Sequence, residues 1–217
     1  RIETKYVANL DGDDDIVYLT GIEQVHSGIE VELAWQLMEM ARLDVGVSLG
    51  NWRYNDNAVG TYRDGDTDAE FGYALKDLMV GDMPQAMLLL GLTLNPIDGA
   101  TVSTSYRYYD KNYADWNVSS REYDPSSGNP DQISNTVYQA PAYGVLDIHA
   151  NYRLPFELGP AKPKLFVHIL NALDATYIQD AVDNSSYNAW NKNSSADDAE
   201  VYFGIPMSFN VGVSVDF

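Results

Sequence analysis

Hydrophobic and polar residues alternate with a period of two along most of the chain, which is the pattern of β-strands. The last stretch, Glu200–Phe217, shows the pattern most clearly. One side of it carries Val211, Val213, Val215 and Phe217, whereas small or polar residues occupy the other. Because Pro206 interrupts strand pairing, we expect an outer extension at Glu200–Ile205 and a separate spanning strand at Ser208–Phe217. The apolar face could pack in a soluble sandwich or meet lipid in a membrane barrel.

The same alternation recurs in stretches upstream of this final strand. They are Arg1–Asn9, Val17–Trp35, Arg42–Tyr54, Pro84–Asn95, Ala100–Lys111, Pro141–Leu154 and Lys164–Tyr177. Each has one mainly apolar face, about nine to eleven residues long, which is the strand length that crosses a bilayer. The sequence therefore predicts an all-β fold of about eight antiparallel strands.

The links between the predicted strands alternate in length. Short links follow Trp35, Asn95 and Leu154, and long polar links follow Tyr54, Lys111 and Tyr177. A sandwich gives no reason for this alternation, whereas membrane barrels have short periplasmic turns and long outer loops. We therefore interpret the chain as an antiparallel transmembrane β-barrel, in which Asp11–Asp15 forms a short outer loop.

Composition and net charge argue against several classes of function. The 217 residues carry a net charge of -19, which argues against nucleic acid as a partner because phosphates require a basic surface. The chain has no cysteine, so it forms no disulfide and no thiolate metal site. We find no nucleophile elbow, phosphate loop or dinucleotide fingerprint, and we expect neither enzyme activity nor a cofactor.

Two sets of residues are candidate metal ligands. Acidic residues alternate at Asp64, Asp66, Asp68 and Glu70, as oxygen ligands do in calcium loops, but the glycine and the final glutamate of an EF-hand are missing. A solvated acidic loop is the simpler explanation of the run, and we therefore predict no metal site there. The three histidines (His26, His149 and His168) lie on different predicted strands, with His149 and His168 facing inward, and their spacing predicts no zinc site.

Aromatic residues in the long polar links are the candidates for ligand contact. They are Trp116, Tyr123, Tyr187 and Trp190. Such side chains can stack on a sugar or grip a chelate, and the alternative is that they pack on one another within the loops.

Several segments taken together resemble a known family. They are HSGIEVELAW (His26–Trp35), GLTLNPIDGATVSTSYRYYDKNYADW (Gly91–Trp116), APAYGVLDIHANYRL (Ala140–Leu154), FVHILNALDATYI (Phe166–Ile178) and the closing Val211–Phe217. In order and spacing they resemble the C-terminal part of a TonB-dependent outer-membrane receptor, most closely of members from Bacteroidota. The run NALDATYI resembles the strand end N-L-F-D-x-x-Y of that family and departs from it at Ala172.

The resemblance implies a bacterial outer-membrane receptor that takes up a siderophore, vitamin, glycan or similar nutrient. Family members have a plug and a barrel of twenty-two strands, so residues 1–217 would be about the last third of the barrel, with the plug absent from this chain. The implied partners are outer-membrane lipid, a TonB-type energy-coupling protein that acts through the plug, the barrel-assembly machinery, and a surface lipoprotein or another subunit. Val211, Val213, Val215 and Phe217 would then close the barrel and serve as the assembly signal.

Two alternatives stay open at this point. One is a complete eight-stranded outer-membrane barrel that acts as an adhesin or structural protein, in which Arg1–Asn9 would pair with the final strand. The other is a soluble β-sandwich that binds glycans, in which a second sheet would bury the apolar faces.

Overall fold

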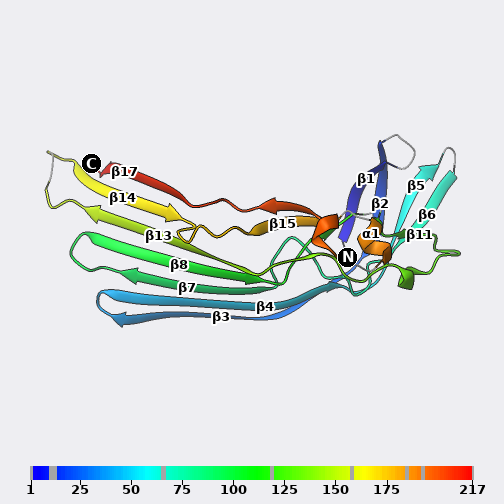
Figure 1. Cartoon of the computed structure of the whole chain (residues 1–217), viewed down its shortest axis with the longest axis horizontal. Coiled ribbons are helices and arrows are strands. Elements are labelled where there is room, and N and C mark those ends of the chain that lie inside the picture. The colour runs from blue at the N-terminus through cyan, green and yellow to red at the C-terminus, as the bar shows by residue number, and fades with distance from the viewer. Residues whose placement is uncertain are drawn as a thin grey trace.

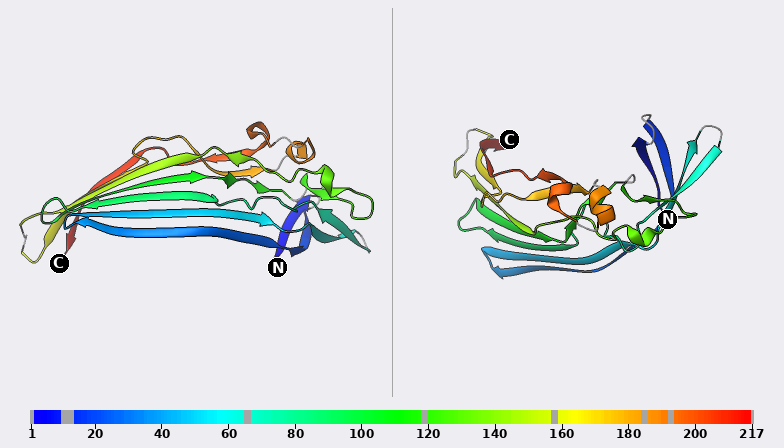
Figure 2. Two further views of the ribbon diagram at one scale, coloured as in Figure 1. Left: turned by 90° about the horizontal axis from the view of Figure 1, so that it is seen from below. Right: turned by 45° about the vertical axis from the view of Figure 1, so that its right-hand side comes forward.

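The computed structural model describes residues 2–9, 14–64, 67–117, 120–156, 159–183, 186–191 and 194–216. Its largest unit is one antiparallel sheet of seven strands in the order β17-β14-β13-β8-β7-β4-β3 (Figure 1). The strands are β3 (Gln24–Met38), β4 (Ala41–Tyr54), β7 (Ala86–Leu94), β8 (Ala100–Asp110), β13 (Tyr143–Arg153), β14 (Lys162–Leu170) and β17 (Ser208–Asp216). We call this unit the wall; it is long and curved (Figure 2).

The register of the wall gives all seven strands one mainly apolar face on the same side of the sheet. Val31 pairs with Val47, and Val47 pairs in turn with Leu88 on the next strand. At the other edge of the wall, Val167 lies opposite Val211 on the same face. Side chains on this face are open to the surroundings, as shown by Phe209, which is 75% exposed. A soluble sandwich requires these side chains to be covered, so that alternative is wrong.

The opposite face of the wall is polar. Glu30 lies opposite Ser48, and Arg42 forms an ion pair of 2.7 Å with Asp44. Further along, Arg107 on β8 pairs with Asp147 on β13. One apolar face and one polar face on every strand is the arrangement of a barrel between lipid and a hydrated lumen, so we call the polar side the lumen face.

The two ends of the wall differ as the link lengths predicted. Short connections lie at one end, between β3 and β4, between β7 and β8, and between β13 and β14, together with the end of β17 (Figure 1). The long connections all lie at the other end, where they form further secondary structure. Among the described residues, no helix is long and apolar enough to cross a membrane.

The elements at the long-connection end, which we call the cap, form three small sheets. A five-stranded sheet has the order β1-β2-β5-β6-β11, and smaller sheets have the orders β10-β15-β16 and β12-β9. The strands are β1 (Ile2–Asn9), β2 (Asp14–Ile22), β5 (Ala58–Asp64), β6 (Thr67–Tyr73), β9 (Asn112–Tyr113), β10 (Asp115–Trp116), β11 (Glu122–Tyr123), β12 (Gln139–Ala140), β15 (Ile178–Asp183) and β16 (Glu200–Phe203). The helices are η2 (Pro130–Gln132), α1 (Ser186–Asn191) and η3 (Ala196–Asp198).

The beginning of the chain corrects two details of the sequence prediction. The first predicted strand, Arg1–Asn9, is not a wall strand, because β1 pairs with β2 in the cap. The predicted single strand Val17–Trp35 divides at Glu23 into β2 of the cap and β3 of the wall. Alternation alone identifies a strand but does not say which sheet it joins.

Both edges of the wall are open. Within the part of the chain that the structure describes, β17 pairs with β14 alone and β3 pairs with β4 alone. The closed eight-stranded barrel required β1 to pair with the final strand, and β1 lies instead against β2. That alternative is therefore wrong, and the barrel to which the wall belongs is not closed by these strands.

Neighbouring substitutions on β4 test which face of the wall meets lipid. We expect Val47→Arg to destabilise the inserted barrel by about 2–4 kcal/mol, the cost of a cation on the lipid face near the bilayer midplane. Ser48→Arg should be tolerated, because residue 48 faces the lumen opposite Glu30. Heat-modifiable migration of the outer-membrane fraction on gels measures the folded population. Equal folding of the two variants would contradict the assignment of the faces.

Candidate functional site in the cap

The cap has a hydrophobic core of its own. The buried side chains are Ile22, Tyr54, Ala58, Tyr73, Leu75, Leu78, Trp116 and Val137. At its centre Trp116, which is 1% exposed, donates a hydrogen bond of 3.0 Å from Nε1 to the hydroxyl of Tyr54. The two rings meet edge to face, with centroids 5.9 Å apart. The long links are thus packed together around Trp116 and hold a defined shape.

A buried arginine organises one segment of the cap. Arg121 is 1% exposed, and its guanidinium donates to the backbone carbonyls of Ser134 and Thr136. Burial lowers the pKa of Arg121 to about 10. A buried cation is costly unless it is hydrogen-bonded, so these contacts hold the segment 134–136 in place.

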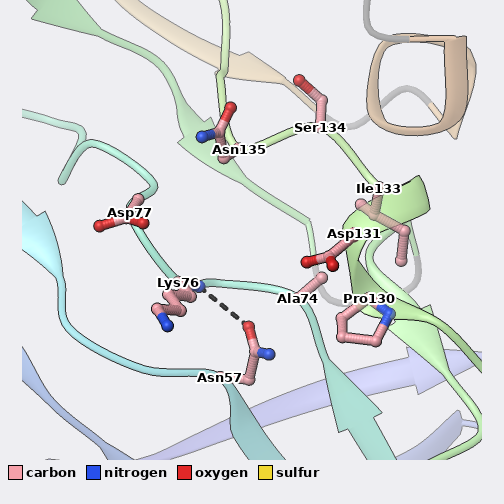
Figure 3. Close-up of a pocket in the computed structure, with 9 residues that line it drawn as sticks. All are labelled: Asn57, Ala74, Lys76, Asp77, Pro130, Asp131, Ile133, Ser134 and Asn135. Atoms are coloured by element: carbon pink, nitrogen blue, oxygen red, sulfur yellow. Dashed lines mark hydrogen bonds between the residues drawn. The ribbon is translucent and has the colours of Figure 1, made fainter.

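Beside this segment lies a polar hollow of about 290 Å³ (Figure 3). It is lined by Asn57, Ala74, Lys76, Asp77, Pro130, Asp131, Ile133, Ser134 and Asn135. Asn57 shapes its floor, because its Oδ1 accepts hydrogen bonds of 3.0 Å from the backbone N–H groups of Leu75 and Lys76. Amide, carboxylate and amino groups from three separate segments therefore converge on one cavity.

Helix α1 adjoins the hollow. The backbone N–H of Ser134 donates to the carbonyl of Ala189 at 2.7 Å, and Ala189 packs with Ala74 and Ile133. The next residue, Trp190, is 46% exposed. An aromatic ring open to solvent thus follows directly on a residue that supports the hollow.

The aromatic residues predicted to contact ligand have different surroundings. Trp116 is buried in the cap core, which agrees with the alternative prediction that these aromatic residues pack within the loops. Tyr123 is half-buried against Ala74 and Ile133, and its ring lies so close over Gly72 that a Cβ there would collide with it. Tyr187 lies in α1, and its side chain is outside the described residues. Of the three whose side chains the structure describes, Trp190 is the exposed one.

Sequence reasoning missed the polar lining of the hollow. Asn57, Lys76, Asp131 and Asn135 stand in polar links without a recognisable motif. The pairing of β5 with β6 and the contacts of Arg121 bring them together, and neither leaves a signal at short spacing.

The acidic run proposed as a calcium loop forms a β-hairpin. Asp64 ends β5 and lies opposite Thr67, while Asp68 lies opposite Arg63. Asp66 is outside the described residues, and Glu70 on β6 is exposed. Among the residues that the structure describes, no three histidine, aspartate or glutamate side chains are placed to hold a metal ion.

The closing strand is placed as the alternation predicted. Val211, Val213 and Val215 lie on the apolar face of β17 and are 64%, 62% and 43% exposed. Phe217 is outside the described residues. The connection into β17 is fixed by Asp174, whose Oδ1 accepts from the backbone N–H of Met207 at 3.0 Å.

The turn before β15 is also tied to the wall. Asn171, at φ 48°, donates through Nδ2 to the carbonyls of Ala175 and Ile205, and its own backbone N–H donates to Asp147 Oδ1 at 2.9 Å. This turn is the start of the run NALDATYI. Its asparagine thereby joins the ends of β13 and β14 to the segment that leads into β17.

Substitution of Trp116 tests the cap core. We expect Trp116→Ala to lower the stability of the cap by about 3–5 kcal/mol, because it leaves a large cavity and removes one hydrogen bond of the Tyr54 hydroxyl. Trp190→Ala is the matched control and should cost far less, since the ring is half exposed. Protease resistance of the cap on intact cells reports the loss. Similar resistance of the two variants would show that Trp116 is not a core residue.

Asp115 gives the cap a pH dependence. Burial, together with the nearby charges of Asp82 and Asp180, raises the pKa of Asp115 above its ordinary value of 3.8. The folded cap then binds this proton more tightly than the unfolded chain, so cap stability rises as the pH falls from neutrality through the raised pKa. We expect Asp115→Asn to stabilise the cap at neutral pH and to flatten this dependence. Thermal unfolding followed by tryptophan fluorescence at neutral and mildly acidic pH measures both effects, and an unchanged slope in the variant would refute them.

Comparison with known proteins identifies the family. The β-barrel family described as TonB dependent receptor-like matches residues 2–172, which is most of the chain and includes β3 to β14 of the wall. No curated protein matches the chain. The match agrees with the polar and apolar faces of the wall and with its short and long connections. The chain therefore belongs to the TonB-dependent receptor β-barrel family, whose members are transporters of the bacterial outer membrane.

Proposed function

We propose that this receptor imports a hydrophilic nutrient, most specifically a glycan, which it captures in the cap. The observation that carries the proposal is the polar hollow beside α1. Since the short turns of such barrels are periplasmic, the cap and its hollow face the cell exterior. A ligand arriving from outside meets this cavity before it meets the lumen.

The chemistry of the hollow suits a polyhydroxylated ligand. Asn57, Lys76 and Asn135 offer donors and acceptors that can pair with hydroxyl groups. The exposed ring of Trp190 next to Ala189 offers a flat apolar surface on which a sugar face can stack. The net charge of -19 disfavours strongly anionic ligands such as many iron chelates.

The rest of the transport machinery is part of the same proposal. Further strands pair with the open edges of β3 and β17 and complete a barrel of twenty-two strands around a plug. Because unpaired backbone groups are costly in lipid, both edges require such partners. A TonB-type protein drives transport through the plug, the assembly machinery recognises β17, and a surface lipoprotein or another subunit can cover the cap.

Growth on defined nutrients tests the proposal. Cells that depend on this receptor are supplied with oligosaccharides, ferric chelates or cobalamin as the limiting nutrient. We expect the receptor to support growth on an oligosaccharide. Lys76→Ala and Asn135→Ala should each raise the concentration needed by about tenfold, the value of one ligand hydrogen bond.

The matched control is Asp98→Ala, an exposed position in the short turn between β7 and β8 at the far end of the wall. It should leave uptake unchanged. If the cells instead need the receptor for growth on a ferric chelate or cobalamin, the glycan proposal is rejected. The proposed transport function would still stand. Wild-type uptake by both hollow variants would place ligand capture elsewhere.

A further inference from the structure

Two histidines meet on the lumen face of the wall, far from the cap. His149 on β13 and His168 on β14 are directly paired positions of neighbouring strands. Their Nδ1 atoms are 2.8 Å apart, and the ring centroids are 4.9 Å apart. They stand nineteen positions apart in the chain, so only the strand register brings them together.

The two Nδ1 atoms are hydrogen-bonded to each other, and the paired positions on the neighbouring strands carry no charged side chain. Ser103 on β8 lies opposite His149, and Asn210 on β17 lies opposite His168. Phe166 packs against the ring of His168, with centroids 5.3 Å apart, and steadies it. The nearest carboxylate along β13, Asp147, is already engaged by Arg107 and by the backbone of Asn171. The two imidazoles are therefore the strong metal-ligand groups at this position.

The two imidazoles are close enough to bind one metal ion together. Metal–nitrogen bonds of about 2.0 Å place two ligand nitrogens about 2.8–3.3 Å apart, and imidazole is a common ligand of Cu²⁺, Ni²⁺ and Zn²⁺. Each ring must turn from its neighbour toward a common point in the lumen, and both rings are half-exposed, which leaves room for that rotation.

We propose that His149 and His168 form a two-imidazole site on the lumen wall for a divalent transition-metal ion, with copper as the preferred metal. The ion replaces the proton shared between the two Nδ1 atoms, and water fills its remaining positions. A hollow of about 650 Å³ on the lumen face is lined by His149 together with Glu32 and Asp44, and it gives the cation a route to the site. Copper should bind more tightly than nickel, following the general order of divalent affinities. The site is independent of the ligand captured in the cap.

Copper binding to the untagged, detergent-purified receptor tests this site. Electron paramagnetic resonance of one equivalent of Cu²⁺ should show coordination by two imidazole nitrogens. His149→Gln and His168→Gln should each lower the copper affinity at least tenfold and reduce the signal to one nitrogen or fewer. His26→Gln is the matched control, because His26 stacks on Trp52 on another strand, and it should change neither quantity.

Several outcomes would overturn the proposal. A spectrum of the wild-type receptor that shows only one coordinating nitrogen would by itself contradict the two-imidazole site. Unchanged affinity in the double variant, with heat-modifiable migration confirming that it folds, would place the copper on other residues. Tighter binding of Zn²⁺ than of Cu²⁺ would contradict the preference for copper.

Discussion

Backbone pairing in a medium without water is the constraint on which this structure depends. In hydrocarbon each unpaired N–H or C=O group costs several kcal/mol, so a strand can cross only with a neighbour on each side. Antiparallel pairing supplies a neighbour on both sides for the five inner wall strands, and on one side for the edge strands β3 and β17. Once that register is set, the period-two alternation decides which residues meet lipid and which face the lumen. The ion pair of Arg107 and Asp147 and the histidine pair both follow from it.

The wall could be predicted from the sequence because its two signals act at short range. Alternating faces identified the spanning strands, and the break at Pro206 correctly separated β16 from β17. The first strand was misplaced because Arg1–Asn9 alternates like a spanning strand, although its partner β2 belongs to the cap. Alternation reports a half-buried strand, and the partner that buries it is decided by contacts distant in sequence.

The cap and its hollow were much less predictable. Trp116 and Trp190 both stand in polar links and are both followed by asparagine, yet one ring is buried against Tyr54 and the other is half exposed. The difference comes from Tyr54, which lies sixty-two positions before Trp116. Likewise, the spacing of the three histidines gave no hint of a ligand pair, because a cross-strand contact is set by register. Residues that act together across sheets leave no local pattern.

Tyr54 ends the wall strand β4 and at the same time belongs to the buried core of the cap. The wall and the cap therefore share one continuous strand, without a linker between them. For protein engineering this means that the outer loops are not interchangeable modules. A chimaera that exchanges the link bearing Trp116 must also carry the matching end of β4. Otherwise it removes the hydrogen bond between Trp116 and Tyr54 and exposes the cap core, which neither detergent nor lipid covers.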